Sequence, residues 1–356
     1  GEILRLSNTL VLFFVKKVHV KRKISTYIFL KETFGQLRKF FQLKKDVEEY
    51  IFMKKALMLG IIAASFLFAA CSSDNASSDE KTVVATTGQI ADAVKAIVGD
   101  EIKVQMLMGP GVDPHLYKAT QSDVKKLENA EMIFYNGLNL EGQLDNIFEQ
   151  MRKDKTVVAA AEILDESKLL ADEENGKLFD PHVWFDISLW SEVVDGIGDA
   201  LIEEYPEHKE LFEKNEKEYL AQLDELKNYV DERVSELSSS QRHLVTAHDA
   251  FNYFGSSLDF TVSGLQGLST EAEYGVKDVE NMVDYLVKQK IKAIFVESSV
   301  SDKAMKAVIE GAQQKNHTVT IGGELFSDAM GAEGTEEGTY IGMYKHNVDT
   351  IVDALK

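Results

Sequence analysis

The chain carries GPGVDPHLYKAT at Gly109–Thr120 and FDPHVWFD at Phe179–Asp186, and the fold and the site that we expect are organised around these two stretches. Each contains Asp-Pro-His, ending in His115 or His182, where an apolar strand-like run gives way to a loop. Proline fixes its own φ and keeps the preceding residue out of the helical region, so each histidine is presented from a stiff loop. A stiffly held imidazole suits a metal site, because an unordered ligand loses its freedom on binding. A surface-loop or helix-capping histidine is the alternative, which the second copy of the tripeptide disfavours.

Short apolar runs alternate with helical stretches on both sides of these tripeptides. The strands expected in the first half are Thr82–Thr86, Ile102–Met108, Met132–Tyr135 and Thr156–Ala159. Two of the helices expected there are Gln89–Val98 and Ser122–Asn129, with Ser122 as a candidate N-cap. The strands expected in the second half are His243–Thr246, Phe260–Gly264, Ala293–Val296 and Thr318–Ile321. Strands that alternate with helices indicate βαβ units and parallel sheets.

One long helical stretch separates the two sets, beginning near Tyr205-Pro206. Its apolar residues recur at helical spacing between charged ones, and they are Leu211, Phe212, Tyr219, Leu223, Leu226, Val230, Val234 and Leu237. The pattern predicts a helix over 207–240, long enough to run the height of a domain. We therefore expect an α/β fold of two lobes, 82–206 and 241–356. Each lobe has a parallel β-sheet flanked by helices, and one long rigid helix joins them.

The second half supplies two more residues of metal-ligand type. His248 follows one expected strand, and Asp328 follows another. Ligands in open α/β sheets bind beyond the carboxyl ends of strands. The four candidates, two from each lobe, therefore converge in the cleft between the lobes. Three imidazoles and one carboxylate suit a divalent cation. Taken singly, His248 also fits a core histidine, and Asp328 also fits a helix cap or turn.

Further polar residues near the expected strands fall into two groups. Glu297 in FVESS and Glu324 in GGELF are candidates to hold an imidazole N–H of a ligand, or they are strand-end turn residues. We leave four histidines out of the site, because they lie in charged helical segments or just before strands. These are His208, His243, His317 and His346.

The first 70 residues differ from the rest. Met53-Lys54-Lys55, the apolar run 56–70 and then Cys71 have the order of a secretory signal, and the run is shorter than the roughly 20 residues of a membrane span. We interpret 53–70 as a lipoprotein signal peptide, Cys71 as the lipidated residue and 71–81 as a flexible tether. Residues 1–52 are then translated upstream sequence. An uncleaved anchor helix is the alternative.

Charge and cysteine content exclude several classes of protein. From Cys71 onward the chain holds 26 basic and 54 acidic residues, a formal charge near −28 against −20 for the whole chain. This acidity argues against a nucleic-acid partner, which needs a basic face, and suits a protein that attracts cations. Cys71 is the only cysteine, so a disulfide within the chain and thiolate metal chemistry are excluded.

Seven motifs in series then give a resemblance to a known family. They are GPGVDPHLYKAT, AEMIFYNGLNLEG, DPHVWFD, LVTAHDAFNYFG, GLQGLSTEAEYG, AIFVESS and IGGELFSDAMG. Across 82–356 the chain resembles the metal-binding solute receptors of ABC transporters, the TroA-like zinc/manganese lipoproteins. The resemblance implies two lobes bridged by a rigid helix. It also implies His115, His182, His248 and Asp328 as the metal ligands.

The resemblance implies an extracytoplasmic receptor, lipid-anchored to the bacterial cell membrane, that delivers a divalent metal to a membrane permease. We expect a monomer that is not an enzyme. The metal is Mn²⁺ or Zn²⁺: His248 stands where manganese-dedicated relatives often have Glu, yet Leu116–Pro181 lacks the histidine-rich loop typical of zinc relatives. A zinc-dependent hydrolase and a surface adhesin are the alternatives. No HExxH or G-x-S-x-G motif supports the first, and nothing specifies an adhesive surface.

Overall fold

The computed structural model describes residues 81–172, 176 and 178–356. All of these residues belong to one compact unit. The expected upstream segment 1–52, signal peptide 53–70, lipidated Cys71 and tether as far as residue 80 lie outside the described residues. Among the described helices, none combines the length and the apolar character needed to cross a membrane.

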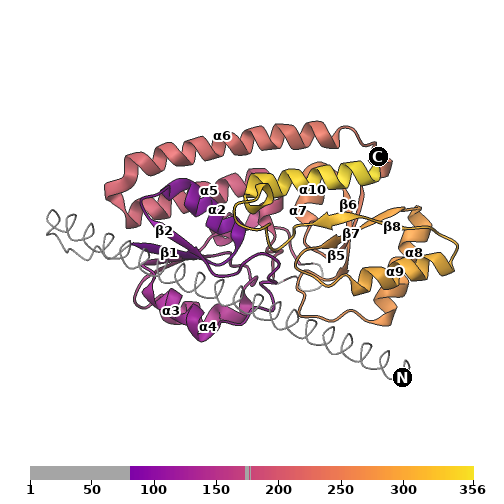
Figure 1. The fold of residues 1–356 in the computed structure, drawn as a ribbon, viewed down its shortest axis with the longest axis horizontal. Helices are drawn as coiled ribbons and strands as arrows, with labels where there is room; N and C mark the ends of the chain where they lie inside the picture. Colours follow the sequence, from indigo (N-terminus) through magenta and orange to yellow (C-terminus); the bar gives the residue numbers. More distant parts are fainter. Residues whose placement is uncertain (1–80, 173–175, 177) are drawn as a thin grey trace, which may run out of the picture. The chain divides into compact units, whose positions relative to one another are not determined.

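Four parallel strands form the sheet of the first lobe in the order β2-β1-β3-β4. The strands are β1 Thr82–Ala85, β2 Lys103–Met106, β3 Met132–Tyr135 and β4 Thr156–Ala159. The helices of this lobe are α2 Gly88–Val98, α3 Gln121–Asn129, α4 Asp145–Met151 and α5 Ile187–Glu204 (Figure 1). Successive side chains of β3 enter different cores: Phe134 packs in the core that contains α2 and α5, and Ile133 in the core that contains α3 and α4. This alternation is typical of a parallel sheet covered on both faces.

The start of α3 differs from the expectation. Thr120, not Ser122, is the N-cap: its backbone is extended, and its hydroxyl accepts a hydrogen bond from the backbone N–H of Asp123. The Asp123 carboxylate in turn accepts from the backbone N–H of Thr120, which completes a capping box. The two residues of a capping box stand three positions apart, as Thr120 and Asp123 do. Ser122 therefore lies inside the first turn of the helix.

The parallel strands of the second lobe form two pairs, β5-β6 and β7-β8, which lie side by side through β5 and β7. The strands are β5 His243–His248, β6 Thr261–Gln266, β7 Ala293–Glu297 and β8 Thr320–Leu325. The helices are α7 Asn252–Leu258, α8 Val276–Gln289, α9 Lys303–Gln314 and α10 Tyr340–Leu355 (Figure 1). Short 3-10 turns occur at η1 Gly142–Leu144, η2 Ala161–Ile163, η3 Glu166–Lys168, η4 Val183–Phe185, η5 Pro206–His208, η6 Ser239–Gln241 and η7 Glu336–Gly338.

Strand β8 begins and ends later than the expected Thr318–Ile321, and two glycines account for the difference. The register between β7 and β8 shifts at Phe295, which pairs with Gly323, so that Gly322 is an extra residue. A Cβ at Gly322 would stand 2.8 Å from the Phe295 ring, and a Cβ at Gly323 would stand 2.3 Å from Thr350 of α10. Only glycine lets the backbone come this close to Phe295 and Thr350. In the sequence alone, a Gly-Gly pair instead predicts the end of a strand.

Helix α6, Lys209–Val234, is the long helix between the lobes and is shorter than the expected 207–240. It begins after the 3-10 turn at Pro206 and ends before the serine-rich η6. Its 26 residues give a length of about 39 Å at 1.5 Å per residue. The helix lies against α2, α5 and α10, and Figure 1 shows it passing over both lobes.

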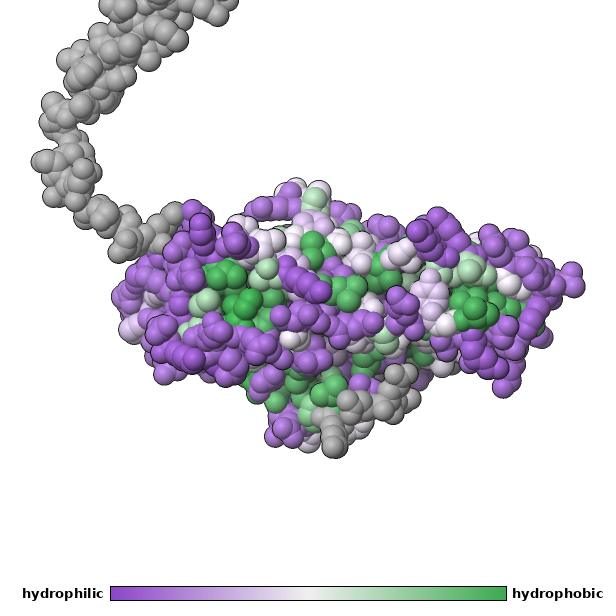
Figure 2. Space-filling model, turned by 90° about the horizontal axis from the view of Figure 1, so that it is seen from below, coloured by the Kyte–Doolittle hydropathy of each residue, from purple (hydrophilic) through white to green (hydrophobic). Residues whose placement is uncertain are grey.

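One hydrophobic core runs through both lobes. It contains Val83 of β1, Leu223 of α6, Phe295 of β7 and Val352 of α10, all fully buried. The face in Figure 2 is mostly hydrophilic, with hydrophobic residues in small separate patches. The expected α/β fold of two lobes with parallel strands, joined by one long helix, is confirmed.

Candidate metal centre

Four polar side chains from four different loops and strand ends meet in the interior. His115 lies in the loop after β2, and His182 immediately precedes η4. His248 is the last residue of β5, and Asp328 lies in the loop after β8. All four are buried, with at most 4 % of their surface exposed. The structure therefore brings together the four residues that the sequence predicts as ligands.

Distances within the cluster suit a single small cation. Asp328 Oδ1 lies 3.3 Å from His182 Nε2, and Asp328 Oδ2 lies 3.3 Å from His248 Nε2 and 3.7 Å from His115 Nε2. One donor atom from each of the four residues lies within 4.8 Å of the others. Donors around a tetrahedral ion with bonds of 2.0–2.2 Å stand roughly 3.3–3.6 Å apart. In the described part of the chain this is the one cluster of His, Cys, Asp or Glu with such geometry.

Five atoms of this cluster are buried without a hydrogen-bond partner. They are Nε2 of His115, His182 and His248 and both carboxylate oxygens of Asp328. A buried polar atom left without a partner costs about 1–3 kcal/mol, and more when it is charged. Five such atoms converging on one point indicate a site for a cation that accepts all of their lone pairs.

Two carboxylates orient two of the imidazoles from behind. Asp180 Oδ1 lies 2.7 Å from His182 Nδ1, and Glu297 Oε2 lies 2.5 Å from His248 Nδ1. Each carboxylate also accepts the backbone N–H of its own histidine, at 2.9 Å and 2.8 Å respectively. A carboxylate at Nδ1 places the ring proton there, so the lone pair of Nε2 faces the centre.

The electrostatics of the cluster separate one imidazole from the other two. Burial lowers the pKa of His115 to about 3, because the charged ring is desolvated. Burial opposes the charged form of His182 as well, but Asp180 and Asp328 outweigh it and raise the pKa of that ring to about 9. Burial likewise opposes the charge on His248, and Glu297 with Asp328 raises its pKa well above the ordinary value. Against its own burial, the pKa of Asp328 is lowered by His248 and His182, so it is ionised.

Glu324 differs from Glu297, although the sequence offers both as partners of a ligand imidazole. Its side chain is exposed, and its backbone oxygen accepts a hydrogen bond from His346 Nε2. Side chains alternate along a strand, and the next residue of β8, Leu325, is fully buried. Glu324 therefore points outward and does not hold a cluster imidazole.

The four histidines set aside at the sequence level have other contacts. His208 stacks on Phe212, and His243 Nδ1 contacts Tyr285 Oη. His317 Nε2 contacts the backbone oxygen of Ile291. The geometry gives these three rings and His346 no place in the cluster.

The aspartates of the two Asp-Pro-His tripeptides hold the backbone of the two histidines, a contact that the sequence motif did not predict. Asp113 Oδ1 accepts the backbone N–H of His115, as Asp180 Oδ1 does for His182, at 2.9 Å in both copies. Such a bond across two residues is an Asx turn, and it explains the Asp at this spacing. The motif itself contains the signal, because an Asp precedes each ligand-type histidine by two positions.

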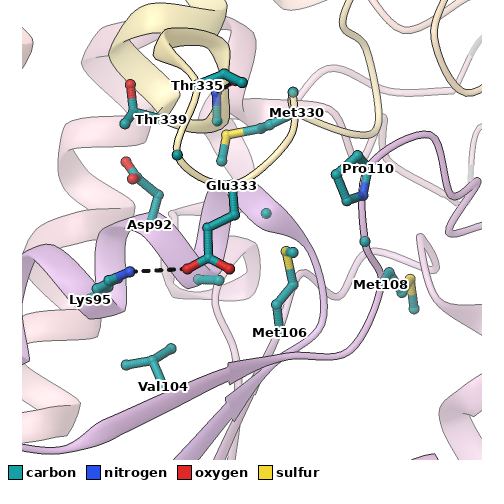
Figure 3. A pocket seen from close by; sticks show the side chains of 16 residues that line it. Asp92, Lys95, Val104, Met106, Met108, Pro110, Met330, Glu333, Thr335 and Thr339 are labelled. Atoms are coloured by element: carbon teal, nitrogen blue, oxygen red, sulfur yellow. Dashed lines mark hydrogen bonds and ion pairs between the residues drawn. The ribbon is translucent and has the colours of Figure 1, made fainter. Parts of the chain in front are cut away.

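A cavity of 340 Å³ lies beside the cluster rather than on it. Its lining includes Met106 and Met108 from the first lobe and Met330, two residues beyond Asp328, from the second (Figure 3). Lys95 and Glu333 form an ion pair of 3.5 Å across it. None of the four cluster residues lines this cavity, which agrees with their burial.

The fold and the cluster together define a two-lobed α/β solute-binding protein. The four buried residues that could bind a metal ion lie where its two lobes meet. The family model described as zinc-uptake complex component A, periplasmic, matches residues 83–354. The chain therefore belongs to this family of metal ABC transporter solute-binding proteins, as the sequence motifs predict.

Two similar proteins are named for binding different metals. The chain is 50% identical to the manganese-binding lipoprotein MntA of Bacillus subtilis over 307 residues, which cover 85% of this chain and 100% of MntA. It is 46% identical to the zinc-binding protein TroA of Treponema pallidum over 299 residues, 84% of this chain and 96% of TroA. The solved structure of TroA superposes with a TM-score of 0.76 at 47% identity, covering 78% of this chain and 99% of TroA.

Proposed function

We propose that this protein captures one Mn²⁺ or Zn²⁺ ion with His115, His182, His248 and Asp328 and delivers it to a membrane permease for uptake. The observation that carries the proposal is the convergence of five buried donor atoms without hydrogen-bond partners. Three imidazole nitrogens and a carboxylate form a donor set that both ions accept. The names of the relatives support both metals, because MntA is manganese-binding and TroA is zinc-binding.

Both oxygens of Asp328 face the imidazoles, which supports a flexible coordination number. With one oxygen bound the shell has four donors, as Zn²⁺ prefers, and with both it has five. Mn²⁺ favours carboxylate oxygen and higher coordination, so the same side chains serve either ion. In this proposal the metal is cargo, and the carboxylate adapts to it.

Delivery requires that the protein stay near the permease. We place Cys71 at the lipid-anchored end of the chain, outside the cytoplasm, with the folded unit as a monomer at the membrane surface. The relatives SsaB and ScaA are named as substrate-binding lipoproteins of metal ABC transporters, which supports this placement. The acidic surface supports attraction of cations from the surrounding solution.

Transport rather than hydrolysis fits the cluster. A catalytic zinc site usually has three protein ligands and an open position for water. Here four side chains fill the shell, and each is at least 96 % buried, so a substrate has no access to the centre. We therefore do not propose the hydrolase, and no feature of the described surface favours the adhesin.

Isothermal titration with Mn²⁺ and Zn²⁺ tests the proposal. The parent should bind one ion per chain, and Ala at any of the four cluster positions should weaken binding by more than the 10–100-fold typical of residues that only orient ligands. His208→Ala is the matched control, because His208 is a histidine outside the cluster, and it should bind as the parent does. Parent-like affinity in His248→Ala or Asp328→Ala would overturn the shared site.

A further inference from the structure

The carboxylates behind the ligand loops of the first lobe are themselves held from the second lobe. Asp113 uses Oδ1 for the backbone of His115, and its Oδ2 accepts a hydrogen bond of 2.6 Å from Thr270 Oγ1. Thr270 lies between β6 and α8 of the second lobe and is 7 % exposed. A second-lobe hydroxyl thereby fixes the carboxylate that orients the loop of His115.

Asp180 repeats this arrangement with a different donor. Its Oδ1 serves His182, and its Oδ2 accepts a hydrogen bond of 3.1 Å from Asn252 Nδ2. Asn252 is the first residue of α7, four positions after His248, and its neighbour Tyr253 donates to the backbone oxygen of Asp180 at 3.1 Å. Both Asp-Pro-His tripeptides are therefore anchored across the lobe boundary through the second oxygen of their aspartate.

The loop of Asp328 is held in the opposite direction. The backbone oxygen of Ser327 accepts hydrogen bonds of 3.2 Å from Gln89 of α2 and from Trp184 of η4, both in the first lobe. His248 is the exception, because its partner Glu297 lies on β7 of the same lobe. Three of the four ligand loops thus depend on the opposite lobe for their position.

We infer that Thr270 and Asn252 are positioning residues that couple metal retention to the contact between the lobes. The inference rests on the proposed function, and it adds how the ion is released. When the lobes separate, His115 and His182 move away from Asp328 and lose the groups that hold their loops. A small opening therefore lowers the affinity for the metal more than the longer ligand distances alone would, because preorganisation of the ligands is lost as well.

Two substitutions test this role against matched controls. Thr270→Val removes the hydroxyl at nearly constant shape, and Thr270→Ser retains it. Thr156→Val is the control, because Thr156 Oγ1 makes a similar bond of 2.7 Å to Glu204 within the first lobe. Asn252→Leu is paired with Asn215→Leu, since Asn215 Nδ2 of α6 donates to the backbone oxygen of Ile97 in α2 at 2.9 Å, a bond that does not join the two lobes.

The measurement is the rate at which full-length protein loaded with Zn²⁺ or Mn²⁺ loses the ion to excess chelator, together with the melting temperature of the metal-free protein. Thr270→Val and Asn252→Leu should each accelerate release about 10-fold or more, the range of groups that orient ligands. Thr270→Ser should restore the parental rate, and both controls should release at that rate. The metal-free melting temperatures should differ little within each matched pair.

The outcomes separate this inference from the proposed function. If the parent retains no ion, the proposed function fails. If the parent binds but Thr270→Val and Asn252→Leu release the ion no faster than their controls, the function stands and the cross-lobe role is wrong. Faster release that Thr270→Ser does not restore would also contradict it, because the hydroxyl would then not be responsible.

Discussion

At the residue scale, the site is defined by which lone pairs have a partner and which do not. The Nδ1 atoms of His182 and His248 each face a carboxylate, and their Nε2 atoms face Asp328. Without an ion, Asp328 is the counter-charge for two protonated rings. With an ion, the rings must be neutral, because a protonated imidazole has no lone pair to give. Metal and protons therefore compete for the same two nitrogens.

This competition predicts a steep pH dependence of metal affinity. The pKa of His182 in the metal-free protein is raised to about 9 and that of His248 is raised well above its ordinary value, so binding at neutral pH displaces protons. Affinity should fall as pH falls below 9, by about 10-fold per unit for each proton displaced. His115 adds no proton in this range, because its pKa is lowered to about 3. Titrations between pH 6 and 9 in buffers of different ionisation enthalpy measure the proton release, and a pH-independent affinity would contradict the account.

A second prediction at the residue scale concerns Glu297 and Glu324, the two glutamates that the sequence suggests as partners of a ligand imidazole. Glu297→Gln keeps the size of the side chain but weakens its hold on His248 Nδ1, so metal affinity should fall about 10–100-fold. Glu324→Gln changes an outward-facing side chain and should leave affinity unchanged. Calorimetry on both variants checks the contrast. Equal losses in the two, or none in Glu297→Gln, would show that this carboxylate does not orient the ligand.

The residues of the cluster could be predicted because they follow strand ends or stiff loops, and parallel strands end at the same edge. The sequence leaves the direction of the Glu324 side chain open, because the extra residue Gly322 and the alternation along β8 decide which way it faces, and no local pattern shows this. Thr270 and Asn252 could not be predicted, since each acts through a contact with a residue far away in the sequence.

At the element scale, the ends of helices depend on capping pairs and on breaks in the chain more than on apolar spacing. The apolar stripe from Leu211 to Leu237 continues beyond α6, yet the helix ends at Val234. The apolar periodicity correctly predicts that a long helix is present. Its ends depend on backbone hydrogen bonds, which Pro206 and the serines after Leu237 redirect into 3-10 turns.

The cap of α3 provides the prediction at this scale. Thr120→Ala removes the hydroxyl that accepts the N–H of Asp123 and should lower the free energy of unfolding by about 1 kcal/mol. Ser122→Ala is the matched control, because Ser122 is inside the first turn, and its effect should stay within about 0.5 kcal/mol. Urea denaturation of the metal-free protein measures both. A larger loss at Ser122 than at Thr120 would return the cap to the position first expected from sequence.

At the scale of the whole folded unit, α6 and α10 join the lobes into one core. Tyr340 and Tyr344 of α10 donate to the backbone oxygens of Trp184 and Phe185 in η4, directly after His182. Separation of the lobes would expose part of this shared core at about 25 cal/mol per Å² of apolar surface. Large opening is therefore costly, and the motions left to the site are small separations of the lobes and local movements of the ligand loops.

Solution scattering should accordingly show little change when the metal binds. A continuous helix resists bending more than paired loops do, so the scattering curves of the metal-free and metal-loaded protein should nearly coincide. Hydrogen exchange should instead slow in the loops that carry His115 and Asp328. A large compaction on binding would show that the shared core does not limit lobe motion.

The most direct test of the central claim, that four side chains of two lobes share one ion, is X-ray absorption at the metal edge of protein loaded with one equivalent of Zn²⁺ or Mn²⁺. For either metal the account predicts a first shell of three imidazole nitrogens and one or two carboxylate oxygens, with the outer scattering of imidazole rings, and for Zn²⁺ these bonds should be about 2.0–2.2 Å long. Each of His115→Ala, His182→Ala and His248→Ala should remove one ring from that signal. A shell of oxygen atoms alone, or a ring signal that survives all three substitutions, would contradict it.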